Sequence, residues 1–474
     1  MACGSFSVVF RRAQECYLFV TRGCSATSDT ALIRSMPVDI PEPLIVVTFR
    51  EVERVLTGEE AVSNIQEAAN SDEESSPAER AAVMAAIGNV LTELRRAEQK
   101  AGARVLSTPH HGPASRLQSL IASGEAARLA LEPLPTGGFE AKFDTSDWFG
   151  WATVAWQKLR HAVPHKMHRP RSSLAEPLPA AGRIALIGDW GTGLYGAPEI
   201  ARAIRNDPDP FLLLLHLGDV YYSGTSKEVT QRFLDPWPFR NDAVNRALNS
   251  NHEMYSGGDA YFDQTLPRFG QEASYFAYQN AHWMLVGLDV AYRDHAIDDE
   301  QVKWLKGIIA LAGERKIVLF SHHQLYSHFE SQGSKLWTHP GFGELLRSKR
   351  IFAWYWGHEH RCTLFQQPDE QFGLWGRCIG HSGMPQSRAE TRNLPHATGK
   401  LYERADWRLS PAQTRGGNKL PAAVVLEGPN KYITDEEHKF TPHGYAVLTV
   451  DGPMLKEEML DAAGQVIYEK VLAS

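Results

Sequence analysis

Apolar runs that alternate with helical patterns restrict the fold of this chain more than any other feature of its sequence. From Arg183 onward, short apolar runs that each end in turn residues or polar residues cover 184–187, 211–215, 283–288, 317–320 and 351–356. Helical patterns over 197–206 and 300–312 lie between several of them. Strands that are apolar throughout need covering on both faces, so the pattern predicts an α/β sheet with helices packed over it.

The end of the chain follows a different pattern. Apolar and polar residues alternate over 445–450, a turn is expected at Asp451-Gly452-Pro453, and two more alternating runs follow. This alternation is typical of antiparallel strands with one face in the core. A sandwich of mixed sheets with flanking helices accommodates both parts, and we place this domain at 182–474.

The N-terminal region contains a clear helix start. Residues 70–76 are acidic and polar, which indicates an exposed loop. Ser76 is a suitable N-cap, Pro77 suits the first helical turn, and Glu79 completes a capping box. We therefore expect a helix that begins directly after this loop.

We treat residues 1–160 as a separate region, mixed in character and partly helical. Further helices are expected over about 115–131 and from Asp147, where three tryptophans at helical spacing indicate a packed apolar face. Residues 161–181 are first basic and then rich in proline and alanine, which is typical of a linker. The region is either a module for an unknown protein partner or a cover for the domain that follows.

The net charge and the cysteine spacing limit which binding partners and which cellular compartment we expect. The formal net charge of −7 gives no reason to expect a nucleic-acid partner. The five cysteines form no CxxC pair, which fits a reducing compartment. The sequence shows neither the apolar stretch of a signal peptide nor the roughly 18 apolar residues of a membrane span. We expect a cytoplasmic protein that does not enter a membrane.

Polar clusters follow the apolar runs, where ligand sites concentrate in open α/β sheets. They are Gly188-Asp189-Trp190-Gly191, Gly218-Asp219-Val220-Tyr221-Tyr222, Asn251-His252-Glu253, Ser321-His322-His323 and Gly357-His358-Glu359-His360. Each alone is weak, since an aspartate after a strand is often a turn residue and a single histidine is often a core group. Their joint occurrence in one order predicts a shared metal site.

The residue types suit a site with two cations. Two ions held about 3.5–4 Å apart need a bridging carboxylate, and together they can hold phosphate oxygens and activate water. Carboxylate and amide oxygens suit hard cations, while imidazoles suit iron, zinc and manganese. Glycines beside the aspartates let the backbone turn sharply.

This ordered set resembles the calcineurin-like metallophosphoesterase superfamily, and it most resembles the purple acid phosphatase branch. The motifs of that branch are GDxG, GDxxY, GNH(D/E), a histidine after a buried strand, and GHxH. The resemblance covers about 182–473 and implies a four-layer α/β/β/α sandwich. Two positions depart from the pattern, because Ser250 replaces a glycine and Gln324 replaces a proline.

The resemblance also implies a role for each matched residue. Asp189, Asp219, Tyr222 and His360 would hold the first metal, and Asp219, Asn251, His322 and His358 the second. Asp219 would bridge the two ions, and a Tyr222 phenolate would favour ferric iron beside iron, zinc or manganese. His323 is the reserve choice for His322. His252 would bind the phosphate or assist the leaving group, and His328 is the candidate proton donor.

The implied reaction is metal-dependent hydrolysis of a phosphate ester, in which a hydroxide that bridges the metals attacks phosphorus. We expect a phosphomonoesterase that acts on a small phosphate-ester substrate. One alternative is a phosphodiesterase for cyclic or linear nucleotides, since the same metal core serves both reactions. An alternative of another class is a metal-binding scaffold without turnover.

Overall fold

The computed structural model describes residues 44–47, 49, 77–101, 105–123, 130–134, 139–142 and 174–474. The expected loop at 70–76, the helix from Asp147 and most of the 161–181 linker lie outside these residues. Helix α3 (Pro77–Ala101) begins at the expected residue. Helix α4 (Gly112–Ser123) begins three residues before the expected position, and the end of the expected range, at 130–131, is instead part of the strand β2 (Ala130–Pro133). No helix in the described residues is both long and apolar enough to cross a membrane.

Two large sheets form the domain from residue 174 to the end. The larger sheet has the order β14 (Asp406–Ser410), β17 (Ala423–Glu427), β12 (Cys362–Phe365), β13 (Trp375–Ile379), β11 (Ile351–Trp356), β10 (Lys316–Ser321), β9 (Trp283–Gly287), β8 (Phe276–Gln279) and β4 (Glu176–Pro177). The smaller has the order β20 (Val466–Ala473), β19 (Met454–Asp461), β18 (Gly444–Asp451), β5 (Ala181–Ile187), β6 (Leu213–His216) and β7 (Val244–Ala247).

The strand directions follow the two sequence patterns. The apolar runs form parallel pairs, β5 with β6, β9 with β10 and β10 with β11, and β7, which is not among those runs, pairs parallel with β6. The alternating runs at the end of the chain form the antiparallel strands β18, β19 and β20. β18 also pairs antiparallel with β5, which joins the two kinds of strand in one sheet.

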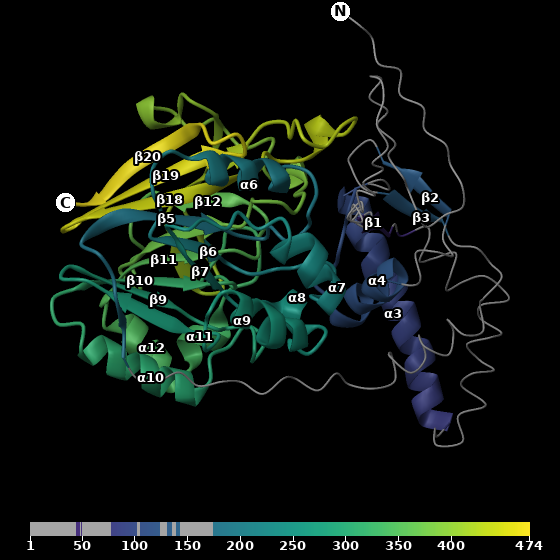
Figure 1. Cartoon of the computed structure of the whole chain (residues 1–474), viewed down its shortest axis with the longest axis horizontal. Helices are drawn as coiled ribbons and strands as arrows, with labels where there is room; N and C mark the ends of the chain where they lie inside the picture. Colours follow the sequence, from purple (N-terminus) through teal and green to yellow (C-terminus); the bar gives the residue numbers. More distant parts are fainter. Residues whose placement is uncertain are drawn as a thin grey trace, which may run out of the picture. The chain divides into compact units, whose positions relative to one another are not determined.

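The sheets pack face to face, with helices on both outer faces (Figure 1). Leu186 of β5, Phe320 of β10 and Leu448 of β18 belong to one buried cluster between the sheets. Outside the smaller sheet lies α6 (Ala197–Asn206), and outside the larger lie α10 (Asp299–Ala310) and α12 (Pro340–Arg347). The predicted four-layer α/β/β/α sandwich is therefore confirmed.

A buried ion pair crosses the core between the two sheets. The guanidinium of Arg377 on β13 contacts Glu457 on β19, with Nη2 to Oε1 at 2.7 Å and Nε to Oε2 at 2.8 Å. Tyr355 on β11 donates to Glu457 Oε2 at 2.9 Å. Neither charged side chain of the pair is exposed. The pair therefore fixes the relative position of the sheets with directional bonds.

The described part of the N-terminal region shares a core with the domain. It contains α3, α4 and a small sheet of β1 (Ile45–Val46), β3 (Phe139–Lys142) and β2 (Ala130–Pro133). Leu106 and Leu117 lie in the same buried cluster as Leu194 and Phe440. Hydrogen bonds join the two parts as well, since Arg232 Nη2 donates to the carbonyl oxygen of Ile45 at 2.6 Å.

Candidate metal centre

The expected ligands stand after strands of both sheets. Asp189, Asp219 and Asn251 follow β5, β6 and β7, while His322 follows β10 and both His358 and His360 follow β11. Parallel strands end at the same sheet edge, so residues far apart in the chain meet there. All six side chains are buried. Short helices complete the turns, as at Asn251, which begins α8 (Asn251–Met254) after the N-cap Ser250.

One group of ligand atoms surrounds the first expected metal position. Asp189, Asp219 and His360 offer ligand atoms that all lie within 4.8 Å of one another. His360 Nε2 is 3.6 Å from Asp189 Oδ1 and 3.8 Å from Asp219 Oδ2. The Tyr221 hydroxyl joins this group, at 2.9 Å from Asp219 Oδ2 and 3.1 Å from His360 Nε2.

A second group surrounds the other expected position. His322 Nε2 lies 2.9 Å from Asn251 Oδ1, 3.2 Å from His358 Nδ1 and 3.2 Å from Asp219 Oδ1. Asp219 therefore presents Oδ2 to the first group and Oδ1 to the second. This is the arrangement that a bridging carboxylate requires.

Two facing lone pairs show that the second group fits a cation. Asn251 Nδ2 donates to Tyr255 Oη, which leaves Asn251 Oδ1 facing His322 Nε2. His322 Nδ1 bonds the carbonyl oxygen of Leu217 at 2.9 Å, so Nδ1 carries the proton and Nε2 holds a lone pair. Burial lowers the pKa of His322 to about 4, which disfavours a second proton on the ring. A metal ion between these atoms would remove the repulsion.

The two carboxylates have opposite pKa shifts. Burial raises the pKa of Asp189 well above its usual range, and the charge of Asp219 adds to this effect. Burial also acts to raise the pKa of Asp219, but His252, His322 and other imidazoles hold it well below its usual range. Two neighbouring buried carboxylates need cations or protons to offset their charge. The acidic pair, like the facing lone pairs, therefore fits a site that binds cations.

The backbone at the site is strained. Left-handed conformations occur at Asp189 (φ 55°), Asp219 (φ 78°), His358 (φ 71°) and His360 (φ 53°). Such conformations cost about 1–3 kcal/mol each and cluster at functional sites. Gly357 allows a close approach, because a Cβ on it would lie 2.6 Å from Asp189 Oδ2. The strained backbone at these four residues therefore directs their side chains into the site.

The tyrosine in the first group differs from the expected one. Tyr222, predicted as the phenolate ligand, points its hydroxyl away from the carboxylates and accepts a bond from Val47 N at 2.8 Å. Its ring packs near Arg232 in the core shared with the N-terminal region. Tyr221, one residue earlier, occupies the ligand position, and we propose it as the phenolate ligand.

Replacing each tyrosine separately with phenylalanine distinguishes the ligand from the structural residue. Tyr221→Phe is expected to abolish the visible absorption of the iron-loaded protein, because the phenolate that would bind ferric iron is lost. Tyr222→Phe is expected to keep that absorption and to lower the free energy of unfolding by about 1 kcal/mol through the lost bond to Val47. Visible spectra and urea unfolding measure both effects, and a reversed spectral pattern would restore Tyr222 as the ligand.

His252 lies beside the first group. Its Nδ1 bonds the carbonyl oxygen of Tyr222 at 2.6 Å, so this nitrogen carries the proton. Nε2 is 3.9 Å from Asp219 Oδ2 and has no hydrogen-bond partner in the described structure. Burial lowers the pKa of His252. The free nitrogen is available to a ligand next to the carboxylates.

His323, the reserve choice, belongs to a neighbouring imidazole group. His295, His323 and His358 offer ligand atoms within 4.8 Å of one another. The His323 ring is fully buried and lies 3.7 Å from the His295 ring, centroid to centroid. Because His322 and not His323 faces Asn251 and Asp219, His322 fits the ligand role. The additional imidazoles favour iron, zinc or manganese on this side.

His328 does not join the site. Its Nδ1 bonds the hydroxyl of Ser410 at 2.7 Å, and its ring packs edge-on against Phe365. Arg415 holds the backbone carbonyls of His328 and Phe329. The loop after β10 is thus bound to Ser410 of β14 and to Arg415, and the described contacts of His328 include none of the expected metal ligands.

Sequence reasoning missed three residues near the site. They are Tyr221, His295 and His110. Tyr221 has a sequence signal, since it adjoins the second motif, and His295 follows the apolar run 283–288 that forms β9. His110 comes from the N-terminal region, where a Pro-His-His-Gly stretch gives no sign of this position.

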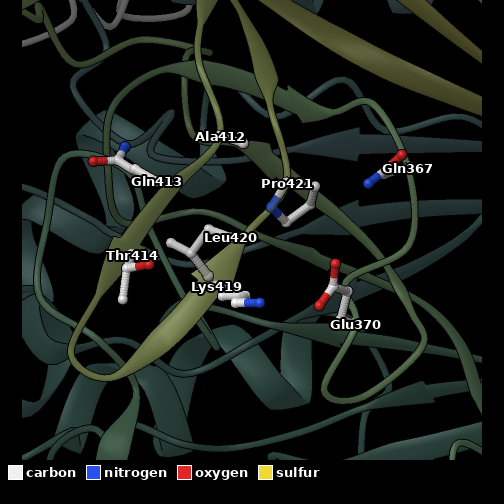
Figure 2. Close-up of a pocket in the computed structure, with 8 residues that line it drawn as sticks. All are labelled: Gln367, Glu370, Ala412, Gln413, Thr414, Lys419, Leu420 and Pro421. Carbon is white, nitrogen blue, oxygen red and sulfur yellow. The ribbon is translucent and has the colours of Figure 1, made fainter.

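A surface pocket lies outside the candidate centre (Figure 2). Its volume is about 310 Å³, and it is lined by Gln367, Glu370, Ala412, Gln413, Thr414, Lys419, Leu420 and Pro421. Three of its polar residues come from the hairpin of β15 (Gln413–Arg415) and β16 (Asn418–Leu420). Since the lining includes none of the expected metal ligands, the pocket is distinct from the centre described above.

The match to one family model supports the assignment of the fold. Residues 182–362 match the family described as calcineurin-like phosphoesterase. A purple acid phosphatase from yellow lupin (Lupinus luteus) seeds is similar at 15% identity and a TM-score of 0.42, over 62% of this chain and 54% of the lupin chain. A predicted phosphoesterase from Streptococcus pneumoniae is similar at 10% identity and a TM-score of 0.27, over 63% of this chain and 100% of that chain.

The chain thus spans about half the length of the lupin protein that it matches. No curated protein matches the chain. The family match covers β5 to β11 and extends to the first residue of β12, and therefore includes the motifs that supply all the expected metal ligands. Residues 182–362 of the chain thus match the calcineurin-like phosphoesterase family over the region that holds these motifs.

Proposed function

We propose that this protein is a metal-dependent phosphomonoesterase with two metal ions, iron together with iron, zinc or manganese. The observation that carries this proposal is the position of Asp219, whose two carboxylate oxygens face separate ligand groups. Asp189, Tyr221 and His360 would hold one ion, and Asn251, His322 and His358 the other, with Asp219 between them. A scaffold role would not require this complete set of ligand types.

The chain's own side chains then have separate tasks. Bound metal ions of this kind acidify water and neutralise phosphate oxygens. Asp219 and Asp189 hold negative charge at the centre, while the Leu217 carbonyl keeps His322 in one tautomer and orientation. His252 turns its free Nε2 toward the space beside the carboxylates, where a proton taken up at Nε2 would let it donate to a phosphoryl oxygen or to the leaving oxygen.

A paired assay tests the proposed function. The chelated protein is expected to be inactive, and reconstitution with iron, zinc or manganese is expected to restore hydrolysis of nitrophenyl phosphate. Bis-nitrophenyl phosphate, a diester, is expected to react at least about tenfold more slowly in kcat/KM, a difference of about 1.4 kcal/mol in barrier height. Faster diester hydrolysis would favour a phosphodiesterase. No hydrolysis of any phosphate ester by the reconstituted protein would favour a scaffold.

A reducing, cytoplasmic location and a small phosphate-ester substrate complete the proposal. Cys362 and Cys378 are both buried free thiols, which suits a reducing compartment. The expected ligands are deeply placed, with His358 and His360 exposing 3% and 7% of their surface. Such a recessed centre favours a substrate whose phosphate can enter ahead of the rest of the molecule.

A further inference from the structure

His110 lies at the candidate metal centre although it comes from outside the matched domain. Its ring stacks on that of His358, with centroids 4.4 Å apart and planes 30° apart. It meets His360 edge-on at 5.5 Å and His252 at 6.0 Å. His360 belongs to the first ligand group and His358 to the second. His252 occupies the neighbouring phosphate-binding position. His110 therefore stands over the junction of the two groups.

The exposure of His110 differs from that of its neighbours. His110 is exposed to solvent, whereas His252 is fully buried and His358 and His360 are nearly so. Within the part of the chain that the structure describes, its ring nitrogens have no hydrogen bond to other side chains or to the backbone. An imidazole whose ring nitrogens are uncommitted, packed against buried ligands, is placed to meet a molecule that enters the centre.

Buried contacts hold the segment that carries His110 in place. Leu106 N donates to Tyr195 Oη at 2.6 Å, before the histidine. After it, the Ser119 hydroxyl on α4 lies 2.7 Å from that of Ser223 and donates to Glu228 Oε1 at 2.8 Å. Ser223 directly follows the second motif, and Glu228 also accepts from Tyr222 N. The segment is therefore bound to the same loop that forms the first ligand group.

A further contact joins this segment to the second ligand group. A Cβ on Gly112 would lie 3.1 Å from the Tyr255 ring, so α4 begins in close contact with that ring. The Tyr255 hydroxyl in turn accepts the hydrogen bond that orients Asn251. The N-terminal segment is therefore positioned against both halves of the centre.

We propose that His110 is a substrate-binding residue, contributed by the N-terminal region, that selects phosphate monoesters. Its ring N–H donates a hydrogen bond to a phosphoryl oxygen. Its ring also occupies space that the second ester group of a diester needs. This proposal rests on the proposed function and gives the N-terminal region a part in the active site.

The test compares His110→Ala with His110→Asn and with the neighbouring variant His111→Asn. His111 Nδ1 accepts from Ala114 N at the start of α4, and asparagine keeps an acceptor there. Equilibrium dialysis of inorganic phosphate against the metal-loaded protein gives the affinity. His110→Ala is expected to weaken phosphate binding about tenfold or more, His110→Asn less, and His111→Asn not measurably.

Steady-state kinetics supply the second measurement. For His110→Ala we expect a higher KM for nitrophenyl phosphate and a several-fold increase in the ratio of diester to monoester hydrolysis. Equal or tighter phosphate binding by His110→Ala, at an unchanged melting temperature, would overturn the proposal. If the unaltered protein binds phosphate and hydrolyses no ester, the proposed function fails while the affinities still decide the role of His110. If the unaltered protein binds no phosphate, the proposed function and the proposed role of His110 both fail.

Discussion

Replacing Asp219 with asparagine is expected to remove the bound metal and to lower hydrolysis at least about a thousandfold. Asp219 presents one carboxylate oxygen to each ligand group. Asparagine has nearly the same shape but lacks the charge and one of the two oxygens. Losing a group that only supports a ligand costs about 10–100-fold in affinity or activity, so losing the shared ligand costs more. Mass spectrometry of bound metal and kcat measure the two effects.

Asp289→Asn is the matched control for this substitution. Asp289 is also a buried carboxylate, and its Oδ1 accepts from Ala291 N and Tyr292 N at 3.1 and 3.0 Å. It lies in neither ligand group, so the variant is expected to retain the metal content of the unaltered protein. Full metal content in Asp219→Asn would show that the carboxylate does not bridge.

Replacing Glu457 with glutamine is expected to lower the free energy of unfolding by about 3–5 kcal/mol. The change leaves the guanidinium of Arg377 charged and buried between the sheets without its carboxylate partner. Breaking one side of a buried pair is costly for this reason, whereas replacing both partners with apolar residues often costs little. Urea unfolding followed by tryptophan fluorescence measures the difference.

A double variant and a surface variant complete this test. Arg377→Met combined with Glu457→Leu is expected to recover most of the lost stability, since no unpaired charge remains in the core. Lys456→Gln, one residue away on β19, removes partly exposed ion pairs with Glu458 and Glu469 and is expected to cost less than about 1 kcal/mol. A loss for Glu457→Gln as small as that for Lys456→Gln would contradict the role assigned to the buried pair.

The layers and most of the centre were predictable because they depend on short-range patterns. The apolar run 351–356 coincides with β11, and 317–320 lies within β10. A buried strand that ends in a polar cluster places that cluster at the sheet edge, whatever lies between the strands in the chain. Asp219 and His322 could therefore be assigned to one site before any coordinates were known.

Choices that depend on the direction of a loop side chain were not predictable. Tyr221 and Tyr222 are adjacent, and only the backbone path of their loop decides which hydroxyl reaches Asp219. His328 follows His322 closely, yet contacts with Ser410 and Arg415 draw its loop toward the other end of the sheet. Each outcome depends on tertiary contacts that no local pattern contains.

The position of His110 depends on packing between distant segments. The shared core and the bonds from Leu106 and Ser119 bring it to the centre, and these partners are separated in the sequence by many residues. The alternative that the N-terminal region is a cover for the domain agrees with these contacts.

Anomalous diffraction from crystals of the metal-loaded protein tests the central claim most directly. We predict two metal peaks about 3.5–4 Å apart, one on each side of the Asp219 carboxylate. Tyr221 and His360 should lie next to one peak, and His322 next to the other. A single peak that Asp219 does not touch, or no peak among these side chains in protein shown to contain metal, would contradict the two-metal account.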